Sequence, residues 1–256
     1  MRFNAVIKRK PARRRLDSLL VDRGLADSLE KAVAIVLAGE VRVNGDPAKK
    51  AGMSVGQEAR IEVISRQAKY ASRGGLKLEG ALQDFAIHPA GLVCLDVGAS
   101  HGGFSDCLLQ HGAVRVYAVD VNIEQLDWKL RQDTRVIPVN RNARELRAED
   151  VPELVDLAAI DVSFISVQKV IAPAAKRAKP GADFLILVKP QFELPRREVG
   201  AGGIVRNKRL HEQAVLAVRQ FAESCGLECL DVRPSRLPGA EGNQEYFLHA
   251  RKKCLE

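Results

Sequence analysis

The segment at residues 95–104, L-D-V-G-A-S-H-G-G-F, constrains the fold of this chain more than any other. An apolar run from Leu92 to Val97 leads into its glycines, and a segment with helical character follows. A second apolar run, residues 115–119, ends at Asp120. Glycines let a ligand approach the backbone, and an acid after the second strand can accept hydrogen bonds from ribose hydroxyls. The pattern therefore predicts a site for a nucleotide-type cofactor.

The spacing of these glycines narrows the choice of cofactor. It is D-x-G-x-x-x-G-G, beginning at Asp96. The spacing that holds the pyrophosphate of a dinucleotide is G-x-G-x-x-G, which this chain does not have here. A ligand without a pyrophosphate, such as S-adenosylmethionine, suits the observed spacing.

From about residue 76, apolar runs alternate with helical stretches. This alternation predicts an α/β fold in which a mainly parallel sheet carries helices on both faces. Ligands of such sheets bind beyond the carboxyl ends of the strands, so the residues just past each strand are the informative ones. We expect a long helix over 208–224 and strands at 92–97, 115–119, 136–139, 157–161, 184–189, 227–233 and 245–250.

The net charge of +8 is concentrated at one end of the chain. Residues 1–75 contain 16 Lys or Arg and 8 Asp or Glu, whereas the remainder contains 24 of each. A compact basic module suggests a polyanion as partner, with nucleic acid first. The alternative is a solvated basic segment without a partner, and we expect residues 1–12 to form a disordered basic tail.

Composition excludes several other classes of protein. An apolar content of 46% supports a core, but no apolar run approaches the ~20 residues of a membrane span. The N-terminus lacks the apolar stretch of a signal peptide. The five cysteines include no Cys-x-x-Cys pair, so neither a disulfide framework nor a metal site is expected. These features favour a cytoplasmic protein that uses no metal and contacts no membrane.

The basic module has a local pattern of its own. We expect a first helix that ends at Gly24, and a second that opens with Asp27 as N-cap and Glu30 in a capping box. Gly39 is a good stop for that helix, and the pair Asn44–Gly45 predicts a tight hairpin turn. A small unit of two helices and short strands, without a catalytic cluster, is typical of a binding module.

A family resemblance supports this interpretation. The segments R-L-D-S-L-L at 15–20, S-L-E-K-A-V-A at 28–34 and G-E-V-R-V-N-G at 39–45 resemble the alpha-L RNA-binding fold of ribosomal protein S-four. The resemblance covers about residues 13–64 and implies a small α+β domain whose basic side chains contact RNA phosphates. A linker at 65–75 would then lead to a second domain at 76–253. The candidates for RNA contacts are Arg14, Arg15, Arg23, Lys31, Arg42 and Arg73.

Four polar residues lie on the first helix of the second domain or at strand ends: Lys77, Asp161, Lys189 and Glu245. Methyl transfer from a sulfonium to a hydroxyl needs no metal, but the hydroxyl must be aligned and its proton removed. Lys189 would be the base and Asp161 its orienting partner, while Lys77 and Glu245 would position a ribose. Taken singly, a lysine past a strand is usually a surface charge, and Asp161 could cap the helix that follows.

Together the four residues resemble the K-D-K-E tetrad of FtsJ-like ribose 2′-O-methyltransferases. The motifs S-R-G-G-L-K-L, D-V-S-F-I-S, L-V-K-P-Q-F-E and G-N-Q-E-Y-F, behind an S-four-like domain, resemble the TlyA family over about residues 13–251. The family implies a Rossmann-like class I methyltransferase domain that uses S-adenosylmethionine. Its expected substrate is the ribose 2′-hydroxyl of cytidine in ribosomal RNA of the large subunit, and in some members also of the small subunit. Some members are labelled haemolysin A.

The resemblance also implies the residues that hold the cofactor. The glycine-containing segment 194–207 is expected to be mobile, either as a lid or as an ordinary loop. Tyr70 stands in the linker where relatives carry Trp, and Trp128 is expected to pack against the sheet. The implied cofactor contacts are Asp96, Gly98, Ser100, Gly102, Gly103, Phe104, Asp120 and Asn142.

Two alternative functions stay open. A non-enzymatic RNA-binding or ribosome-assembly factor would carry a vestigial cofactor fold, but the intact glycine turn and the four polar residues favour an enzyme. A membrane-lytic haemolysin is disfavoured, because the sequence offers neither an apolar span nor a convincing basic amphipathic helix.

Overall fold

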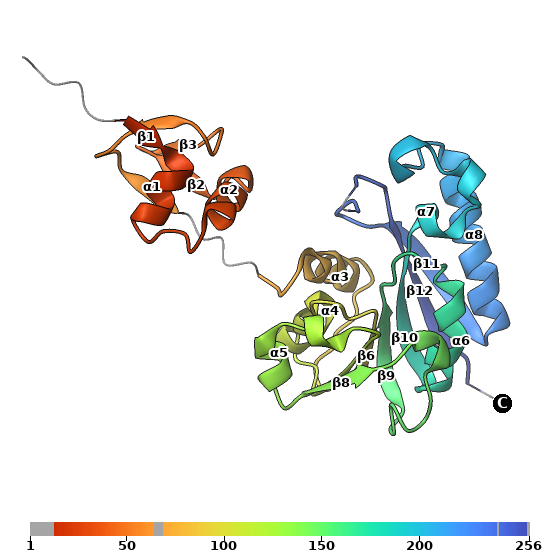
Figure 1. Ribbon diagram of the computed structural model, residues 1–256. Helices are drawn as coiled ribbons and strands as arrows, with labels where there is room; N and C mark the ends of the chain where they lie inside the picture. The colour runs from red at the N-terminus through yellow and green to blue at the C-terminus, as the bar shows by residue number, and fades with distance from the viewer. Residues whose placement is uncertain (1–12, 64–68, 240, 255–256) are drawn as a thin grey trace, which may run out of the picture. The chain divides into compact units, whose positions relative to one another are not determined.

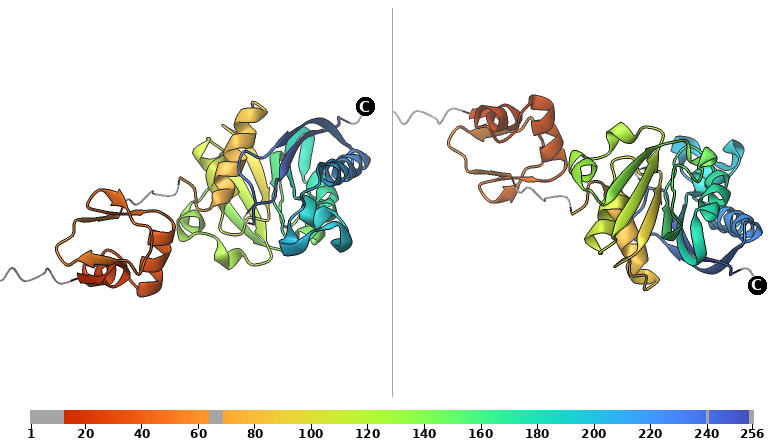
Figure 2. Two further views of the ribbon diagram at one scale, coloured as in Figure 1. Left: turned by 90° about the horizontal axis from the view of Figure 1, so that it is seen from above. Right: turned by 90° about the horizontal axis from the view of Figure 1, so that it is seen from below.

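The structure is a computed structural model that describes residues 13–63, 69–239 and 241–254 of the chain. The chain folds into two compact units, of which the first ends at Gln67 and the second begins at Ala68. Figures 1 and 2 show the elements of each unit. The tail expected at 1–12 and the first part of the expected linker, 65–68, lie outside the described residues.

Over residues 13–63, the N-terminal unit contains two helices and two small antiparallel sheets. One sheet pairs β1 with β4, and the other pairs β2 with β3 and β5. Leu16, Leu20, Ala32 and Val41 are fully buried between the elements. The small α+β domain is therefore confirmed. Its elements are β1 (Arg13–Arg15), α1 (Leu16–Asp22), α2 (Leu29–Leu37), β2 (Val41–Val43), β3 (Asp46–Pro47), β4 (Ser54–Gly56) and β5 (Ile61–Val63).

Helix α2 begins one residue later than its sequence suggested. Ser28 has an extended backbone and is the N-cap, and its Oγ accepts a hydrogen bond from the backbone N–H of Lys31 at 3.2 Å. The prediction of Asp27 as N-cap is wrong, because Asp and Ser are equally good caps and only the backbone conformation decides between neighbours. The stop at Gly39 and the hairpin turn at Asn44–Gly45 are confirmed by the positive φ angles of all three residues.

The second unit is built on a seven-stranded sheet of order β11-β12-β10-β9-β6-β7-β8. Strands β8, β7, β6, β9 and β10 are parallel, and β12 runs antiparallel to both of its neighbours. The expected seven strands and mainly parallel sheet are confirmed. The strands are β6 (Val93–Val97), β7 (Arg115–Asp120), β8 (Val136–Asn140), β9 (Val155–Ile160), β10 (Ala178–Val188), β11 (Leu227–Pro234) and β12 (Tyr246–Lys252).

Helices cover both faces of this sheet. Helices α3, α4 and α5 lie on one face, and α6 and α8 lie on the other (Figures 1 and 2). The central strands β9 and β10 are continuously apolar where both of their faces are buried, over Leu157–Ile160 and Phe184–Val188. The helices are α3 (Arg73–Asp84), α4 (Gly103–Gln110), α5 (Trp128–Gln132), α6 (Gln168–Lys176), α7 (Pro190–Glu193) and α8 (Lys208–Ser224), with short 3₁₀ turns η1 (Ile123–Gln125), η2 (Ala143–Glu145), η3 (Arg196–Glu198) and η4 (Ala201–Gly203).

The strand order places the candidate site. The chain runs from β6 outward to β7 and β8 on one side, and returns to β9 and β10 on the other side. A crevice opens at the carboxyl ends of the strands where the order reverses in this way. The glycine turn follows β6 directly, so it lies at this crevice.

Three details differ from the sequence-based expectations. Strand β10 begins at Ala178 and not at 184, because Pro180 and Gly181 in its first half gave the signal of a turn. Tyr70 is buried and Ser72 caps α3, so the later part of the expected linker is packed on the second unit. Trp128 is exposed over 63% of its surface, so the prediction that it packs against the sheet is wrong. It is the first residue of α5, which buries Leu130 instead.

Candidate active site

The glycine turn brings the backbone of β6 against the segment that follows β9. Gly98 has a φ of 88°, and a Cβ there would collide with the carbonyl oxygen of Asp161. Gly102 has a φ of 89°, and a side chain there would strike Leu126 and Leu130. Both positions therefore require glycine, and the turn leaves its backbone open to a ligand.

Asp120 fixes the turn from the end of β7. Its Oδ2 accepts a hydrogen bond from the backbone N–H of Ser100, and its Oδ1 accepts one from Asn122, both at 2.9 Å. Ser100 itself has a φ of 48°, which an L-residue rarely adopts. The carboxylate thus holds the strained turn and faces the space beside it.

Asp96 lies beneath the turn and is fully buried. Its Oδ2 accepts hydrogen bonds from the backbone N–H and the Oγ of Ser105, at 2.9 and 2.6 Å. Burial raises the pKa of the Asp96 carboxyl to about 7, because the charged form is poorly solvated there. Among the described residues its Oδ1 has no hydrogen-bond partner. Asp96 therefore braces the start of α4 from below.

Two adjoining hollows open beside the turn, with volumes of about 220 and 430 Å³. Both are lined by Gly98, Ser100, Asp161 and Ser163. Of the expected cofactor contacts, Gly103 and Phe104 line the smaller hollow only, and Asp120 and Asn142 line the larger one only. Asp96 and Gly102 support the turn without lining either hollow.

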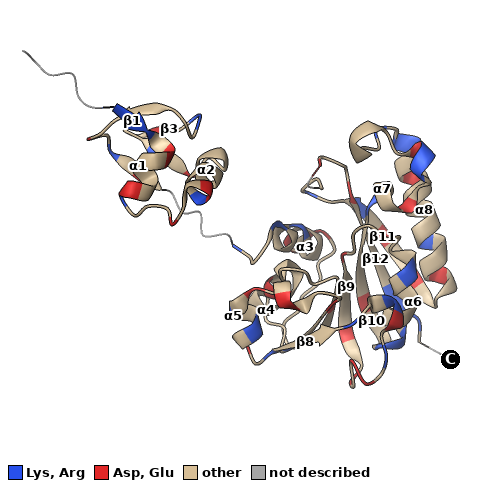
Figure 3. Ribbon diagram, in the orientation of Figure 1, with Lys and Arg blue, Asp and Glu red and all other residues tan. Residues whose placement is uncertain are grey.

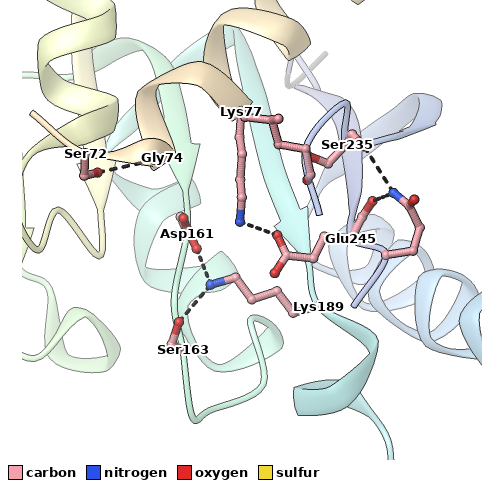
Figure 4. Close-up of polar contacts among 10 residues, drawn as sticks. Ser72, Gly74, Lys77, Asp161, Ser163, Lys189, Ser235 and Glu245 are labelled. Carbon is pink, nitrogen blue, oxygen red and sulfur yellow. Dashed lines mark hydrogen bonds and ion pairs between the residues drawn. The ribbon is translucent and has the colours of Figure 1, made fainter. Parts of the chain in front are cut away.

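The four residues expected at the strand ends lie together as two ion pairs (Figure 4). Lys77 Nζ on α3 lies 2.6 Å from Glu245 Oε2, and Lys189 Nζ lies 2.5 Å from Asp161 Oδ1. Lys77, Lys189 and Glu245 are buried. Removing one member of a buried pair typically costs 3–5 kcal/mol because the other charge is left unpaired, so both pairs strongly constrain the elements that they join.

The positions of these side chains follow from local structure. Asp161 comes directly after β9, where its backbone N–H donates to Val97 O at 2.9 Å. Pro190 starts α7 and keeps Lys189 extended at the end of β10. Glu245 precedes β12, and a side chain on Gly239 would approach its Oε1 to 2.6 Å. Gly239 therefore leaves the space that the Glu245 carboxylate occupies.

Glu193 and Ser163 are two neighbours of the ion pairs that the sequence did not single out. Glu193 accepts hydrogen bonds from Ser166 Oγ at 2.6 Å and from the backbone N–H of Val167 at 2.7 Å. Glu193, and not Asp161, thus caps the segment that leads into α6. Lys189 Nζ also donates to Ser163 Oγ at 2.8 Å. The only sequence feature that pointed to them was their position inside two motifs: Ser163 lies in D-V-S-F-I-S, and Glu193 lies in L-V-K-P-Q-F-E.

The segment 194–207 is tied to the loop before β12. The Asn243 side chain accepts from the backbone N–H of Val205 at 2.9 Å and donates to the carbonyl of Gly203 at 2.8 Å. His211 on α8 lies 2.7 Å from the carbonyl of Val205 through its Nε2. These contacts hold the segment against the loop before β12 and against α8, and no described residue of the segment lines either hollow.

The candidate RNA contacts differ in their surroundings within their own units. Arg14 pairs with Asp22 at 2.7 Å, and Arg15 pairs with Asp17 at 2.5 Å. Arg23 donates to two backbone carbonyls of the N-terminal unit. The side chains of Lys31 and Arg42 are exposed, and Arg73 lines the smaller hollow of the second unit. Figure 3 shows acidic residues among the basic ones on the N-terminal unit.

Known proteins resemble the chain over nearly its whole length. The FtsJ-like methyltransferase family matches residues 70–252, and the S4 domain matches residues 14–61. The 16S/23S rRNA (cytidine-2′-O)-methyltransferase TlyA of Mycobacterium tuberculosis is 45% identical over 93% of this chain and 90% of its own.

Two further relatives carry a different name. Hemolysin A of Brachyspira hyodysenteriae is 41% identical over 92% of this chain and 98% of its own. A solved structure from Streptococcus thermophilus, provisionally named a hemolysin, has a TM-score of 0.74 at 39% identity and covers 95% of this chain and 89% of its own. From these matches and the geometry of the site, the chain belongs to the FtsJ-like methyltransferases, in the TlyA family that carries an S4 domain.

Proposed function

We propose that this protein transfers a methyl group from S-adenosylmethionine to the 2′-hydroxyl of cytidine in ribosomal RNA. The observation that carries the proposal is the meeting of two ion pairs, Lys77–Glu245 and Lys189–Asp161, beside the glycine turn. The name of the M. tuberculosis relative supports cytidine in rRNA as the target, in either subunit. The S4 domain supports RNA as the partner.

The residues around the two hollows fit S-adenosylmethionine. The larger hollow presents the Asp120 carboxylate and the Asn142 amide, which can accept hydrogen bonds from ribose hydroxyls and contact an adenine edge. The smaller hollow presents Lys77 and Arg73. Gly98 lines both hollows and has no side chain, so a ligand that spans the two hollows would lie directly against the backbone of Gly98. We infer that the adenosine part binds in the larger hollow and the amino-acid part in the smaller one.

The residues of the two ion pairs would act on the ribose. When bound, S-adenosylmethionine supplies a methyl group on a sulfonium, which leaves as a neutral sulfide. Lys189 takes up the proton of the hydroxyl, and Asp161 orients its amine and stabilises the ammonium that forms. Lys77 lines the smaller hollow and can donate a hydrogen bond to the substrate ribose, while the ion pair with Glu245 fixes the direction of the Lys77 side chain.

The N-terminal unit would hold the RNA. The exposed side chains of Lys31 and Arg42 are the best candidates for phosphate contacts, because Arg14, Arg15 and Arg23 already bind groups of their own unit. Phosphate contacts position a protein without reading sequence, so the choice of nucleotide would rest with the catalytic unit. An rRNA substrate agrees with the expected cytoplasmic location.

A methyl-transfer assay tests this proposal. The protein is incubated with tritiated S-adenosylmethionine and ribosomal subunits or naked rRNA, and label in RNA is counted. We expect incorporation by the wild type and its loss in Lys189→Ala. Lys179→Ala is the matched control, because Lys179 lies near the start of β10, whose other end leads to Lys189, and it lines neither hollow and pairs with Asp156 at the surface. Absence of label with every rRNA substrate would refute the proposal.

The hemolysin names belong to the relatives. In the described ranges no helix combines the length and the apolar character that crossing a membrane requires. A non-enzymatic RNA-binding role would be supported instead if calorimetry showed no binding of S-adenosylmethionine.

A further inference from the structure

The amine of Lys189 is buried next to the residues that line the two hollows. Its side chain is only 8% exposed. Within the described part of the chain, Lys189 lines neither hollow, whereas Asp161 and Ser163 line both. Figure 4 shows these two residues on the amine, with Ser163 Oγ and Asp161 reaching Nζ from different directions. A ribose hydroxyl that approaches a methyl group held where the two hollows adjoin would therefore meet Asp161 or Ser163 before it meets Lys189.

Ser163 has the chemistry to connect the hollow with the amine. Lys189 Nζ donates to Ser163 Oγ at 2.8 Å, which leaves the hydroxyl hydrogen of Ser163 free to turn. A hydroxyl can accept from an ammonium and donate to a neutral amine. Ser163 is thus a suitable partner for Lys189 in both protonation states, and its exposed side chain faces the hollows.

The loop that carries Ser163 is held in place on both sides. Phe164 has a φ of 67°, a strained value for an aromatic residue, and its ring lies 5.5 Å from that of Phe192. Ser166, three residues after Ser163, donates to Glu193. Phe192 and Glu193 follow Lys189 closely in sequence, so the serine and the lysine belong to one rigid pair of segments.

Asp161 is the less suitable route for the proton. Its Oδ1 forms an ion pair with Lys189, and a carboxylate is a much weaker base than an amine. A proton from a ribose hydroxyl, which is a poor acid, needs the stronger base as its final acceptor. Asp161 and Ser163 both line the hollows and contact that base, and Ser163 is the one whose hydroxyl can accept one proton while it donates another.

We propose that Ser163 relays the proton of the ribose 2′-hydroxyl to Lys189 during methyl transfer. In one concerted step the 2′-oxygen forms its bond to the methyl carbon, the carbon–sulfur bond breaks, and sulfur keeps that electron pair. The 2′-hydroxyl proton passes to Ser163 Oγ as the hydroxyl proton of Ser163 passes to Lys189 Nζ. The products are a 2′-O-methyl ribose, a neutral sulfide and a Lys189 ammonium. This relay rests on the proposed function.

Single-turnover kinetics on rRNA, with the full-length protein in excess, test the relay. Ser163→Ala should lower the rate of methyl transfer by about 10- to 100-fold, which is less than the loss in Lys189→Ala, because the ribose hydroxyl can then pass its proton to Lys189 directly, although less favourably. Ser163→Thr, which keeps a hydroxyl, should recover most of the rate. Ser224→Ala is the matched control: it removes an exposed hydroxyl at the end of α8, outside both hollows and away from the Ser163 loop, and should stay within about twofold of the wild type.

A proton inventory separates a relay from a structural role. In mixtures of H₂O and D₂O, the wild-type rate should fall along a curve, because two protons move together, whereas that of Ser163→Ala should fall along a straight line. An unchanged rate and curvature in Ser163→Ala would overturn the relay, and so would equal losses in Ser163→Ala and Ser224→Ala. Failure of the wild type to methylate any rRNA would instead refute the proposed function, and the relay with it.

Discussion

Lys77 on α3 and Glu245 before β12 form a buried ion pair, with 2.6 Å between Nζ and Oε2, although 168 residues separate them in the chain. The pair joins the first helix of the catalytic unit to its last strand. It therefore makes the geometry of the site depend on the complete folding of that unit.

An apolar replacement of this ion pair should preserve the stability of the protein but not its methyl-transfer activity. Glu245→Ala should lower the free energy of unfolding by about 3–5 kcal/mol, because the Lys77 ammonium is left buried without a partner. The double variant Lys77→Met with Glu245→Leu should regain most of that stability and yet remain inactive. Urea unfolding and the methyl-transfer assay measure the two properties. Glu223→Ala, in the exposed pair with Arg219 on α8, is the control and should cost about 0.5 kcal/mol or less. Activity in the double variant would contradict the proposed role of the pair.

Gly98 should be required for cofactor binding beyond its effect on stability. Gly98→Ala adds a Cβ at a φ of 88° and directs it at the carbonyl oxygen of Asp161. Gly181→Ala is matched to it, since Gly181 has a φ of 80° but open space around it. Both variants should lose about 1 kcal/mol or more of stability from backbone strain. Calorimetry should show loss of S-adenosylmethionine binding in Gly98→Ala alone, and equal affinities would count against the assigned cofactor site.

Asp96 should make the protein less stable as the pH rises. Its carboxyl has a pKa of about 7 in the folded chain and about 4 when unfolded, so the folded state binds more protons between these values. The contribution of Asp96 to stability is therefore present below about pH 4 and is lost progressively up to about pH 7. The total change is on the order of 4 kcal/mol. Asp96→Asn should remove this slope, which denaturant titrations of both proteins from pH 4 to pH 8 would reveal. Parallel pH profiles of the two proteins would contradict the assignment.

Substitutions of Arg23 and Lys31 should affect different properties of the N-terminal unit: its stability for Arg23 and its RNA binding for Lys31. Arg23 donates to the carbonyls of Ala59 and Gln57, at 2.7 and 2.5 Å, so Arg23→Ala should cost about 1 kcal/mol of stability. Lys31→Ala should leave stability unchanged and weaken RNA binding. If Lys31 contacts one phosphate, the salt dependence of log K should flatten by about 0.7 to 0.9. Binding titrations at several salt concentrations measure this, and an unchanged slope would remove Lys31 from the interface.

The sequence predicted the parts of this structure that repeat a simple pattern. Apolar runs of strand length located the sheet, and polar residues at the ends of those strands located Lys189 and Asp161 because parallel strands end at one edge. The sequence did not predict the details for which neighbouring residues give equivalent or conflicting signals. Ser28 and Asp27 are equivalent as caps in sequence, and Pro180 with Gly181 hid the first half of β10.

The neighbours of the ion pairs were harder to foresee. The motif D-V-S-F-I-S marks the segment that contains Ser163 but does not separate this serine from Ser166, because its role depends on a contact with Lys189 across 26 residues. Glu193 is similar, since its partners Ser166 and Val167 come from another segment. Such residues are found only once the fold has brought the segments together.

The identity of the methylated nucleoside tests the central claim most directly. Ribosomal RNA that lacks the modification is incubated with S-adenosylmethionine and wild-type protein, digested to nucleosides and examined by mass spectrometry. Our account predicts 2′-O-methylcytidine with the wild type and with Lys179→Ala, and none with Lys189→Ala. A methyl group on a base, or methylation that survives in Lys189→Ala, would contradict it.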